Sequence, residues 1–352
     1  MVSRRHVLKS LPVLMAAPAA ARLFGQAAKP QIAVRSFSQM TLGVSDVKRS
    51  LEFYQRLFGM PIQARQGSSV LLRVGAGPQF LALTPAGSGG AGFSHYGLAV
   101  ENFNADRLVA TLDAHGVSRA GASADGLSGG PMKVRVRARG PEAGGAAEGT
   151  TEVFVGDPDG VVFQLQDPSY CGGAGAMGQV CASVTPSPTP GLIALKDISH
   201  FTIAATDAAR ANAFYKDLFG FGVRAMQAAT PAHGVGKGIQ FLMFTGGAGA
   251  GRGGAPPRPA RIDHACLNLE KFNVDEIQKK LESVGIKPRG TTSPGAPAAP
   301  LVHYVSMRME NRGGAPGGTP ELYFTDPDGL AIQLQDVSYC GGGGYLGNTC
   351  LS

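Results

Sequence analysis

The chain has 352 residues, of which 43% are hydrophobic and 16% charged, so it can bury a core and general disorder is excluded. Its 51 glycines and 24 prolines follow no three-residue period, which excludes collagen and assigns the excess to loops. Four of the seven excess positive charges fall within the first 26 residues, so the remainder is weakly basic and predicts no nucleic-acid partner.

The N-terminus reads as a targeting segment. Residues 3–9, SRRHVLK, resemble the twin-arginine export signal, and a weakly hydrophobic stretch follows over residues 11–23. Pro12 and Pro18 interrupt this stretch, which is too short to cross a bilayer, so no membrane span is predicted. We interpret residues 1–27 as a signal peptide and expect a periplasmic or secreted protein. The alternative is a chance arginine pair before an apolar stretch.

Secondary-structure patterns then follow in a regular order. The first copy of the pattern begins with a strand at 40–44 and an apolar-striped helix that ends at Gly59; two strands follow. A second strand, helix and strand series closes the unit; its elements are expected at 96–100, 105–115, 133–137, 151–155 and 161–166. Each half is a βαβββ module, which predicts an α+β fold with mainly antiparallel sheets. The alternating arginines of 133–139 are expected to form a solvated face.

An internal repeat divides the chain into two domains. The sequence FYQRLFG at 53–59 recurs as FYKDLFG at 214–220, and DPDG at 157–160 recurs at 326–329. We therefore predict an N-terminal domain at 34–168 and a C-terminal domain at 196–338. A cysteine-containing tail and a Pro/Ser/Thr-rich linker occupy 169–195, and a second cysteine tail occupies 339–352.

Four of the five cysteines belong to the two tails. Cys171 and Cys181 are ten residues apart, as are Cys340 and Cys350, with glycine-rich chain between them. In an oxidising compartment this spacing predicts two local disulfides. A four-cysteine zinc site is the alternative, but the closely spaced cysteine pairs of such sites are missing. Cys266 is left unpaired.

The strand–Asp–helix opening with FYxxLFG and the closing DPDG turn resemble the vicinal-oxygen-chelate superfamily. This superfamily includes glyoxalase I, fosfomycin-resistance enzymes, bleomycin-binding proteins and extradiol dioxygenases. The resemblance covers essentially all of 36–168 and 196–336. It implies that the paired βαβββ modules of each domain curl into a half-open cup. We expect each copy to be a self-contained cup of eight strands and two helices.

The same resemblance implies a metal site. The family takes one His from the first strand, one His from the first strand of the second module and a Glu from the last strand. These positions fall on His200, His264 and Gln333 in the C-terminal domain, and on Gln39, His95 and Gln164 in the N-terminal domain. Gln in place of Glu keeps an oxygen donor but removes one negative charge. A divalent metal, Fe2+ or Mn2+ with Zn2+ as a further option, is expected only in the C-terminal cup.

Three further side chains are candidates for that cup. Tyr323 lies ten residues before Gln333, where extradiol dioxygenases place a Tyr that hydrogen-bonds substrate. His303, in the strand expected at 301–308, is predicted to face the same cavity as an acid or base. Cys266 follows His264 by two residues and so shares its face, as a packing residue rather than a nucleophile.

Two functions remain open from the sequence. One is a metal-dependent enzyme, a dioxygenase or a lyase or isomerase, that acts on a small vicinal-oxygen substrate in the C-terminal cup. The other is a metal-free small-molecule-binding protein of the bleomycin-resistance type, whose cups are lined by Gln39, Gln164 and Gln333. Both have a small-molecule ligand as partner. The sequence does not specify the substrate, the reaction or the oligomeric state.

Overall fold

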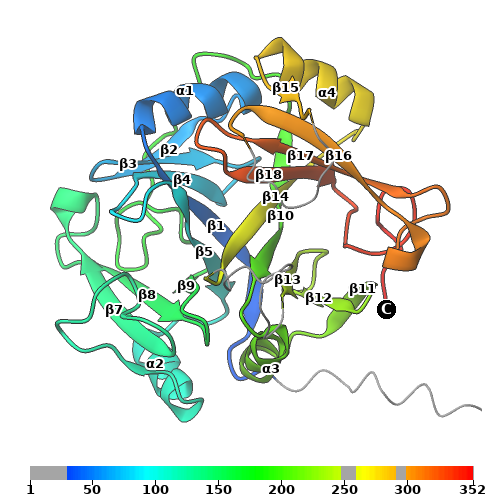
Figure 1. The fold of residues 1–352 in the computed structure, drawn as a ribbon. Coiled ribbons are helices and arrows are strands. Elements are labelled where there is room, and N and C mark those ends of the chain that lie inside the picture. Colours follow the sequence, from blue (N-terminus) through cyan, green and yellow to red (C-terminus); the bar gives the residue numbers. More distant parts are fainter. Residues whose placement is uncertain (1–29, 247–258, 291–298, 352) are drawn as a thin grey trace, which may run out of the picture.

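The computed structural model describes residues 30–246, 259–290 and 299–351, so the predicted signal peptide at 1–27 lies outside the described residues. Each copy of the repeat forms its own nine-stranded mixed sheet (Figure 1). This confirms the α+β class and the two tandem domains. In the described part of the chain, no helix is long and apolar enough to cross a membrane.

The first sheet is built from two modules that meet in its middle. Its strand order is β2-β3-β4-β1-β5-β9-β8-β7-β6, and β1 pairs with β5 in antiparallel fashion at the junction. The helices of this copy are α1 (Val47–Phe58), α2 (Ala105–Ala114) and the short η2 (Pro141–Ala143). The strands are β1 (Val34–Val44), β2 (Ile62–Gln66), β3 (Ser69–Arg73), β4 (Phe80–Pro85), β5 (Gly92–Val100), β6 (Ser118–Arg119), β7 (Lys133–Arg139), β8 (Thr150–Gly156) and β9 (Val162–Gln166).

The second sheet repeats this topology in the order β11-β12-β13-β10-β14-β18-β17-β16-β15. Its helices are α3 (Ala208–Phe219), α4 (Val274–Ser283) and η3 (Glu310–Arg312). Its strands are β10 (Leu195–Ala204), β11 (Val223–Gln227), β12 (Thr230–Gly234), β13 (Phe241–Thr245), β14 (Arg261–Leu269), β15 (Lys287–Pro288), β16 (Val302–Arg308), β17 (Thr319–Thr325) and β18 (Ala331–Asp336). Eight strands were expected in each copy. The additional ninth strand is a two-residue strand at the edge of the sheet, β6 in the first copy and β15 in the second.

Local signals in the sequence fix both ends of α1. The Asp46 side chain accepts a hydrogen bond from the backbone N–H of Arg49, which caps the first turn. Gly59 ends the helix with φ of 66°, a left-handed conformation that favours glycine. A side chain at this position would also meet the carbonyl oxygen of Pro190 at 2.3 Å. The linker between the copies therefore lies directly against this helix end.

The expectation that each copy is self-contained is wrong, because each copy covers part of the other. Phe53 and Phe58 of α1 pack against Phe324 of β17, which belongs to the second sheet. Reciprocally, Phe214 and Phe219 of α3 contact Phe163 of β9 in the first sheet. The two copies are thus interlocked in the reciprocal manner of a twofold arrangement (Figure 1).

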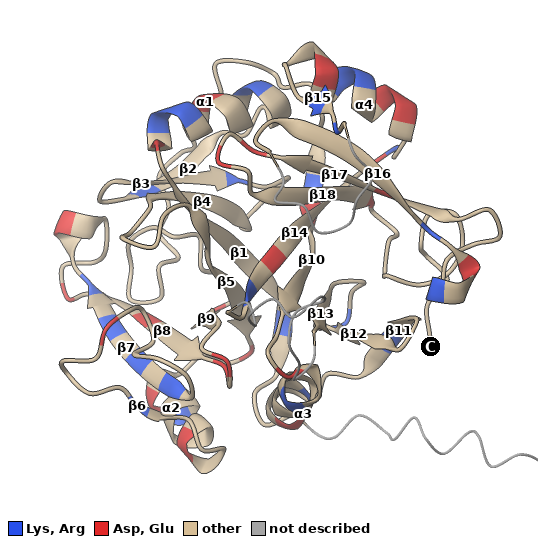
Figure 2. Ribbon diagram, viewed as in Figure 1, with Lys and Arg blue, Asp and Glu red and all other residues tan. Residues whose placement is uncertain are grey.

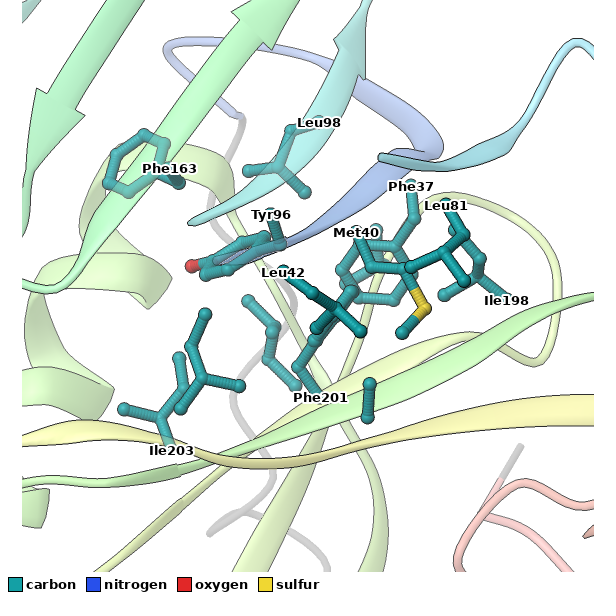
Figure 3. Close-up of a cluster of buried hydrophobic side chains, with 14 of the residues drawn as sticks. Phe37, Met40, Leu42, Leu81, Tyr96, Leu98, Phe163, Ile198, Phe201 and Ile203 are labelled. Carbon is teal, nitrogen blue, oxygen red and sulfur yellow. The ribbon is translucent and has the colours of Figure 1, made fainter. Parts of the chain in front are cut away.

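A single hydrophobic core runs through this interface. Phe37, Tyr96, Phe201 and other fully buried residues of both copies belong to one cluster (Figure 3). The rings of Phe37 and Phe201 meet edge to face with centroids 4.9 Å apart. Folding of one copy therefore buries apolar surface of the other, and burial of this kind is the main stabilising contribution to a fold.

Both predicted disulfides are present. Cys171 is bonded to Cys181 and Cys340 to Cys350, each pair with its Cα atoms 6.3 Å apart. Each tail lies against the sheet of its own copy. In the first copy, Gln63 donates a hydrogen bond to the carbonyl of Cys171 over 3.0 Å. The tails are therefore anchored parts of the cups.

Candidate functional site

The predicted metal ligands of the C-terminal cup lie on neighbouring strands. His200 of β10 pairs with Cys266 of β14, and Cys266 pairs with Gln333 of β18. Gln333 in turn pairs with Tyr323 of β17. Paired residues on adjacent strands project from the same face of a sheet. His264 precedes Cys266 by two residues and so joins this face from the next position along β14.

The two imidazoles of this cup are buried and meet edge to face. The ring centroids of His200 and His264 are 5.6 Å apart, with an angle of 84° between the rings. Burial, reinforced by the neighbouring His264, lowers the pKa of His200 well below its ordinary value, and a hydrogen bond with Gln333 opposes this shift. His200 is therefore neutral at pH 7, which is the form of imidazole that binds metal ions.

Each imidazole also has a hydrogen-bond partner at Nδ1. This atom lies 3.3 Å from Ser199 Oγ in His200 and 3.1 Å from Asp263 Oδ2 in His264. Metal-binding histidines typically hold their second ring nitrogen in this way, because the partner fixes the tautomer and the ring orientation. The arrangement leaves Nε2 of His264 for coordination, whereas His200 also forms a hydrogen bond with Gln333, the third candidate ligand.

The donor set of this cup fits a divalent ion. Two imidazole nitrogens and an amide oxygen are ligands that Fe2+, Mn2+ and Zn2+ all accept in proteins. The Gln333 amide has an Nε2 atom that is buried and without a hydrogen-bond partner, so its position is not explained by a complete hydrogen-bond network. Among the described residues, no group of three His, Cys, Asp or Glu side chains is arranged to hold a metal ion, and the third candidate donor here is an amide.

Tyr323 lies beside this set. Its ring meets that of His264 edge to face at 5.3 Å and stacks on Tyr304 at 5.1 Å. Burial raises the pKa of Tyr323 well above its ordinary value, and the Glu321 carboxylate adds to this. The phenol is therefore protonated at pH 7 and can donate a hydrogen bond.

The corresponding residues of the N-terminal cup form a connected hydrogen-bond network. The Gln39 amide nitrogen donates to Gln164 Oε1 over 2.7 Å and lies 3.0 Å from His95 Nε2. His95 also lies 3.2 Å from the hydroxyl of Thr41. Burial lowers the pKa of His95 to about 4, so the network carries no charge at pH 7. This cup offers one imidazole and two uncharged amides, so its donor set is poorer for a divalent ion than that of the C-terminal cup, which has two imidazoles.

A cavity of about 370 Å³ opens above this network. Gln39, His95 and Gln164 line it together with Phe154 and Arg137. The position of this cavity was not expected from the sequence, which directed attention to the other copy. In the C-terminal copy, Met243 takes the place of Ala82 and Tyr323 that of Phe154, so the two cups differ in bulk and polarity.

One predicted site residue faces the wrong way. His303 Nε2 lies 3.2 Å from Glu282 Oε1, and its Nδ1 lies 3.4 Å from Gln278 Nε2; both partners belong to α4. Its neighbour Tyr304 stacks on Tyr323 on the cup face, and successive strand residues point to opposite faces. The expectation that His303 shares the cavity with His264 is therefore wrong.

Cys266 lies within the row of cup residues but is fully buried. Burial raises the pKa of its thiol well above the ordinary value, and Ser199 provides a hydrogen bond that partly opposes this. The thiol is protonated at pH 7 and unsuited to act as a nucleophile. These properties agree with the packing role expected for it.

Each copy contains a buried ion pair that was not predicted from the sequence. Arg139 Nε donates to Glu152 over 2.7 Å, and Arg308 Nε donates to Glu321 over 2.7 Å. Arg139 is only 8% exposed, so the solvated face expected for 133–139 does not include it. The same offset of 169 relates both residues of one pair to those of the other, and this spacing was the available signal.

Each ion pair connects a cup strand to its disulfide tail. Arg308 Nη2 donates to the carbonyl of Gly342 over 2.9 Å, and Tyr339 donates to Glu321 over 2.9 Å. Arg139 makes the equivalent bond to Gly173 over 2.9 Å. The buried charges therefore hold the tails against the cups.

With this geometry established, comparison with known proteins identifies the family. The sequence profile of the Glyoxalase/Bleomycin resistance protein/Dioxygenase superfamily matches residues 36–165 and 197–334. The chain belongs to this superfamily. No curated protein sequence matches it.

Several solved structures share the fold of this chain. A catechol 2,3-dioxygenase is similar with a TM-score of 0.55 and 16% identity, over 89% of this chain and 88% of that chain. Homoprotocatechuate 2,3-dioxygenase from Arthrobacter globiformis is similar with a TM-score of 0.56 and 18% identity, over 87% of this chain and 81% of that chain. The Mn(II)-bound glyoxalase from Novosphingobium aromaticivorans is similar with a TM-score of 0.51 and 16% identity, over 86% of this chain and 82% of that chain. These structures agree with this chain in fold, and at such identities the likeness extends to the fold alone.

Proposed function

We propose that this protein acts on a small vicinal-oxygen substrate through a divalent metal ion held in the C-terminal cup by His200, His264 and Gln333. The observation that carries the proposal is the edge-to-face pair of buried imidazoles beside Gln333, with the Nδ1 of His264 held by Asp263. The superfamily neighbours named as dioxygenases and as a Mn(II)-bound glyoxalase support an ion of this class.

The residues of the cup have separate tasks in this proposal. A bound ion would act as a Lewis acid on two adjacent substrate oxygens. His200 and His264 supply nitrogen donors, and Asp263 keeps His264 in the required tautomer. Gln333 adds an oxygen without charge, so the substrate itself must bring negative charge for tight binding. Tyr323, which lies beside His264 with a protonated phenol, would donate a hydrogen bond to that substrate.

Metal binding tests this proposal directly. Protein dialysed anaerobically against Mn2+ or Fe2+ should retain one ion per chain by elemental analysis, and His200→Ala should abolish retention. Gln333→Glu should tighten binding, because it restores a negative ligand. Gln164→Glu is the matched control in the N-terminal cup and should leave metal content unchanged. A metal-free wild type combined with no gain in Gln333→Glu would refute the proposal.

The second candidate function is a metal-free binding protein of the bleomycin-resistance type. The connected, uncharged network of Gln39, His95 and Gln164 beneath a cavity favours it for the N-terminal cup. For the whole protein, it requires that the C-terminal cup also bind ligand without metal. This function would be established instead if both cups bind ligand after metals are removed by chelation, and if both still bind it in His200→Ala.

We also propose that the protein is exported to an oxidising compartment. Two disulfides close the tails, and such bonds persist outside the reducing cytosol. Replacement of Arg4 and Arg5 by lysine should keep the protein in the cytoplasm, as measured by cell fractionation. Export that continues unchanged in this variant would contradict the twin-arginine interpretation.

A further inference from the structure

The N-terminal cup has a cavity whose one imidazole and two uncharged amides are a poor donor set for a metal, so we consider which other groups could recognise a ligand there. The cavity of about 370 Å³ falls in the range of small-molecule sites. Its floor is the uncharged network of Gln39, His95 and Gln164, and these three side chains are at most 7% exposed.

Two hydrogen-bonding atoms in the floor of the cavity have no partner. Gln39 Oε1 and Gln164 Nε2 are buried and have no hydrogen-bond partner, which leaves one acceptor and one donor unused. If both amides are reversed, the unused atoms exchange roles, and one donor and one acceptor still remain. A hydroxyl group can both donate and accept, so it suits this end of the cavity. An ionised group does not, because the floor offers no opposite charge.

The opposite end of the cavity presents a cation. Arg137 lies on β7, along which basic residues alternate (Figure 2). Its guanidinium lies over the ring of Phe154, 5.7 Å from the centroid. No described carboxylate lies within ion-pair distance of Arg137, whereas the neighbouring Arg139 is paired with Glu152. An uncommitted guanidinium at the rim of a cavity is a typical partner for a carboxylate.

The wall between the two ends is apolar and flat. Phe154 contacts His95 edge to face at 5.4 Å on one side and lies below Arg137 on the other. Phe80 and Ala82 line the same cavity. Glu142, the remaining carboxylate at the rim, is exposed and folds back toward Gly140 of its own turn.

We propose that the N-terminal cup is a metal-independent binding site for a small organic acid with a flat apolar body, whose carboxylate pairs with Arg137 and whose neutral polar end meets Gln39 and Gln164. The C-terminal copy lacks the cation proposed to pair with the carboxylate, because Ser306 stands at the position of Arg137. The proposal goes beyond a metal centre in the C-terminal cup and does not depend on it.

Calorimetry on the full chain after removal of metals by chelation tests this site, with 4-hydroxybenzoate as the probe. We expect one binding event per chain. Arg137→Ser, which introduces the residue of the other copy, should weaken binding at least about tenfold, because it removes a charge-assisted hydrogen bond. The uncharged probe 4-hydroxybenzamide should bind wild-type protein correspondingly more weakly. Glu142→Gln should bind 4-hydroxybenzoate more tightly, because it removes a repelling charge at the rim.

Two variants are the controls. Arg56→Ser removes an equal charge from the exposed face of α1 and should leave binding unchanged. His200→Ala should also leave it unchanged, which separates this site from the proposed metal centre. The proposal is overturned if 4-hydroxybenzoate does not bind, if Arg137→Ser binds it as well as wild type, or if His200→Ala abolishes binding. The metal content of the same samples reports independently on the C-terminal cup.

Discussion

Tyr54 of the first copy donates a hydrogen bond to the carboxylate of Asp326 in the second copy, with an O···O distance of 3.2 Å. Tyr215 and Asp157 make the reciprocal contact, at 3.4 Å. The tyrosines belong to the FYxxLFG motif and the aspartates to the DPDG turn. The two repeated motifs of this chain are therefore the two sides of one contact, made twice across the interface between the copies.

This contact predicts a pH dependence of stability. Burial raises the pKa of both Asp157 and Asp326 to about 6, from a value of 3.8 when exposed. The folded state thus holds protons that the unfolded state releases, so this contribution to stability is complete below about pH 4 and is lost as the pH rises through about 6. Each site should account for roughly 2–3 kcal/mol.

Urea denaturation at about pH 4.5 and pH 7.5 measures this effect. Asp157→Asn and Asp326→Asn keep the hydrogen-bond acceptor but cannot ionise. The free energy of unfolding of the double variant minus that of wild type should therefore be larger at pH 7.5 than at pH 4.5. An identical pH dependence in the two proteins would contradict the prediction. Asp113→Asn, on the surface of α2, is the control.

The buried Arg308–Glu321 pair predicts strong coupling in a double-mutant cycle. Arg308 is fully buried and Glu321 is 5% exposed, so removal of either partner leaves an unpaired buried charge. Arg308→Met or Glu321→Gln should each lower the free energy of unfolding by about 3 kcal/mol. The double variant should lose much less than the sum of the two. Additive losses, measured by denaturant unfolding, would show that the pair acts only through packing.

The two disulfides should each stabilise the fold to a similar extent. Closing a loop of this length is expected to contribute roughly 2.5–3 kcal/mol. We expect Cys171→Ser with Cys181→Ser to lower the unfolding free energy by about this amount, and the matching pair of replacements at Cys340 and Cys350 to do the same. Unchanged thermal unfolding in either variant would argue against a stabilising role for that bond.

Cys266 should be unreactive in the native protein. It is fully buried and its thiol pKa lies well above the ordinary value. Iodoacetamide should label it only after unfolding, and peptide mapping of the native protein should find one free thiol and two disulfides. Rapid labelling of native protein at pH 7 would show that the cup opens to solvent at this position.

The sequence by itself determined the order of elements and the paired disulfides, because these depend on local spacing. The N-caps Asp46 and Asp207, the glycines that end the helices and the ten-residue cysteine spacings all act within a few residues. The resemblance to the vicinal-oxygen-chelate superfamily assigned His200, His264 and Gln333 to strands that prove to be neighbours.

The tertiary structure decided what depends on contacts between distant segments. His303 of β16 points toward α4 in the folded protein. Successive strand residues point to opposite faces, so an error of one residue in the expected alternation is enough to assign a side chain to the wrong face. The packing of α1 on β17 made the two copies one interlocked core. Ala82 and Phe154 line the cavity of the N-terminal cup, and Met243 and Tyr323 stand at these positions in the other copy. Volume and burial of this kind arise only when strands far apart in the sequence are brought together.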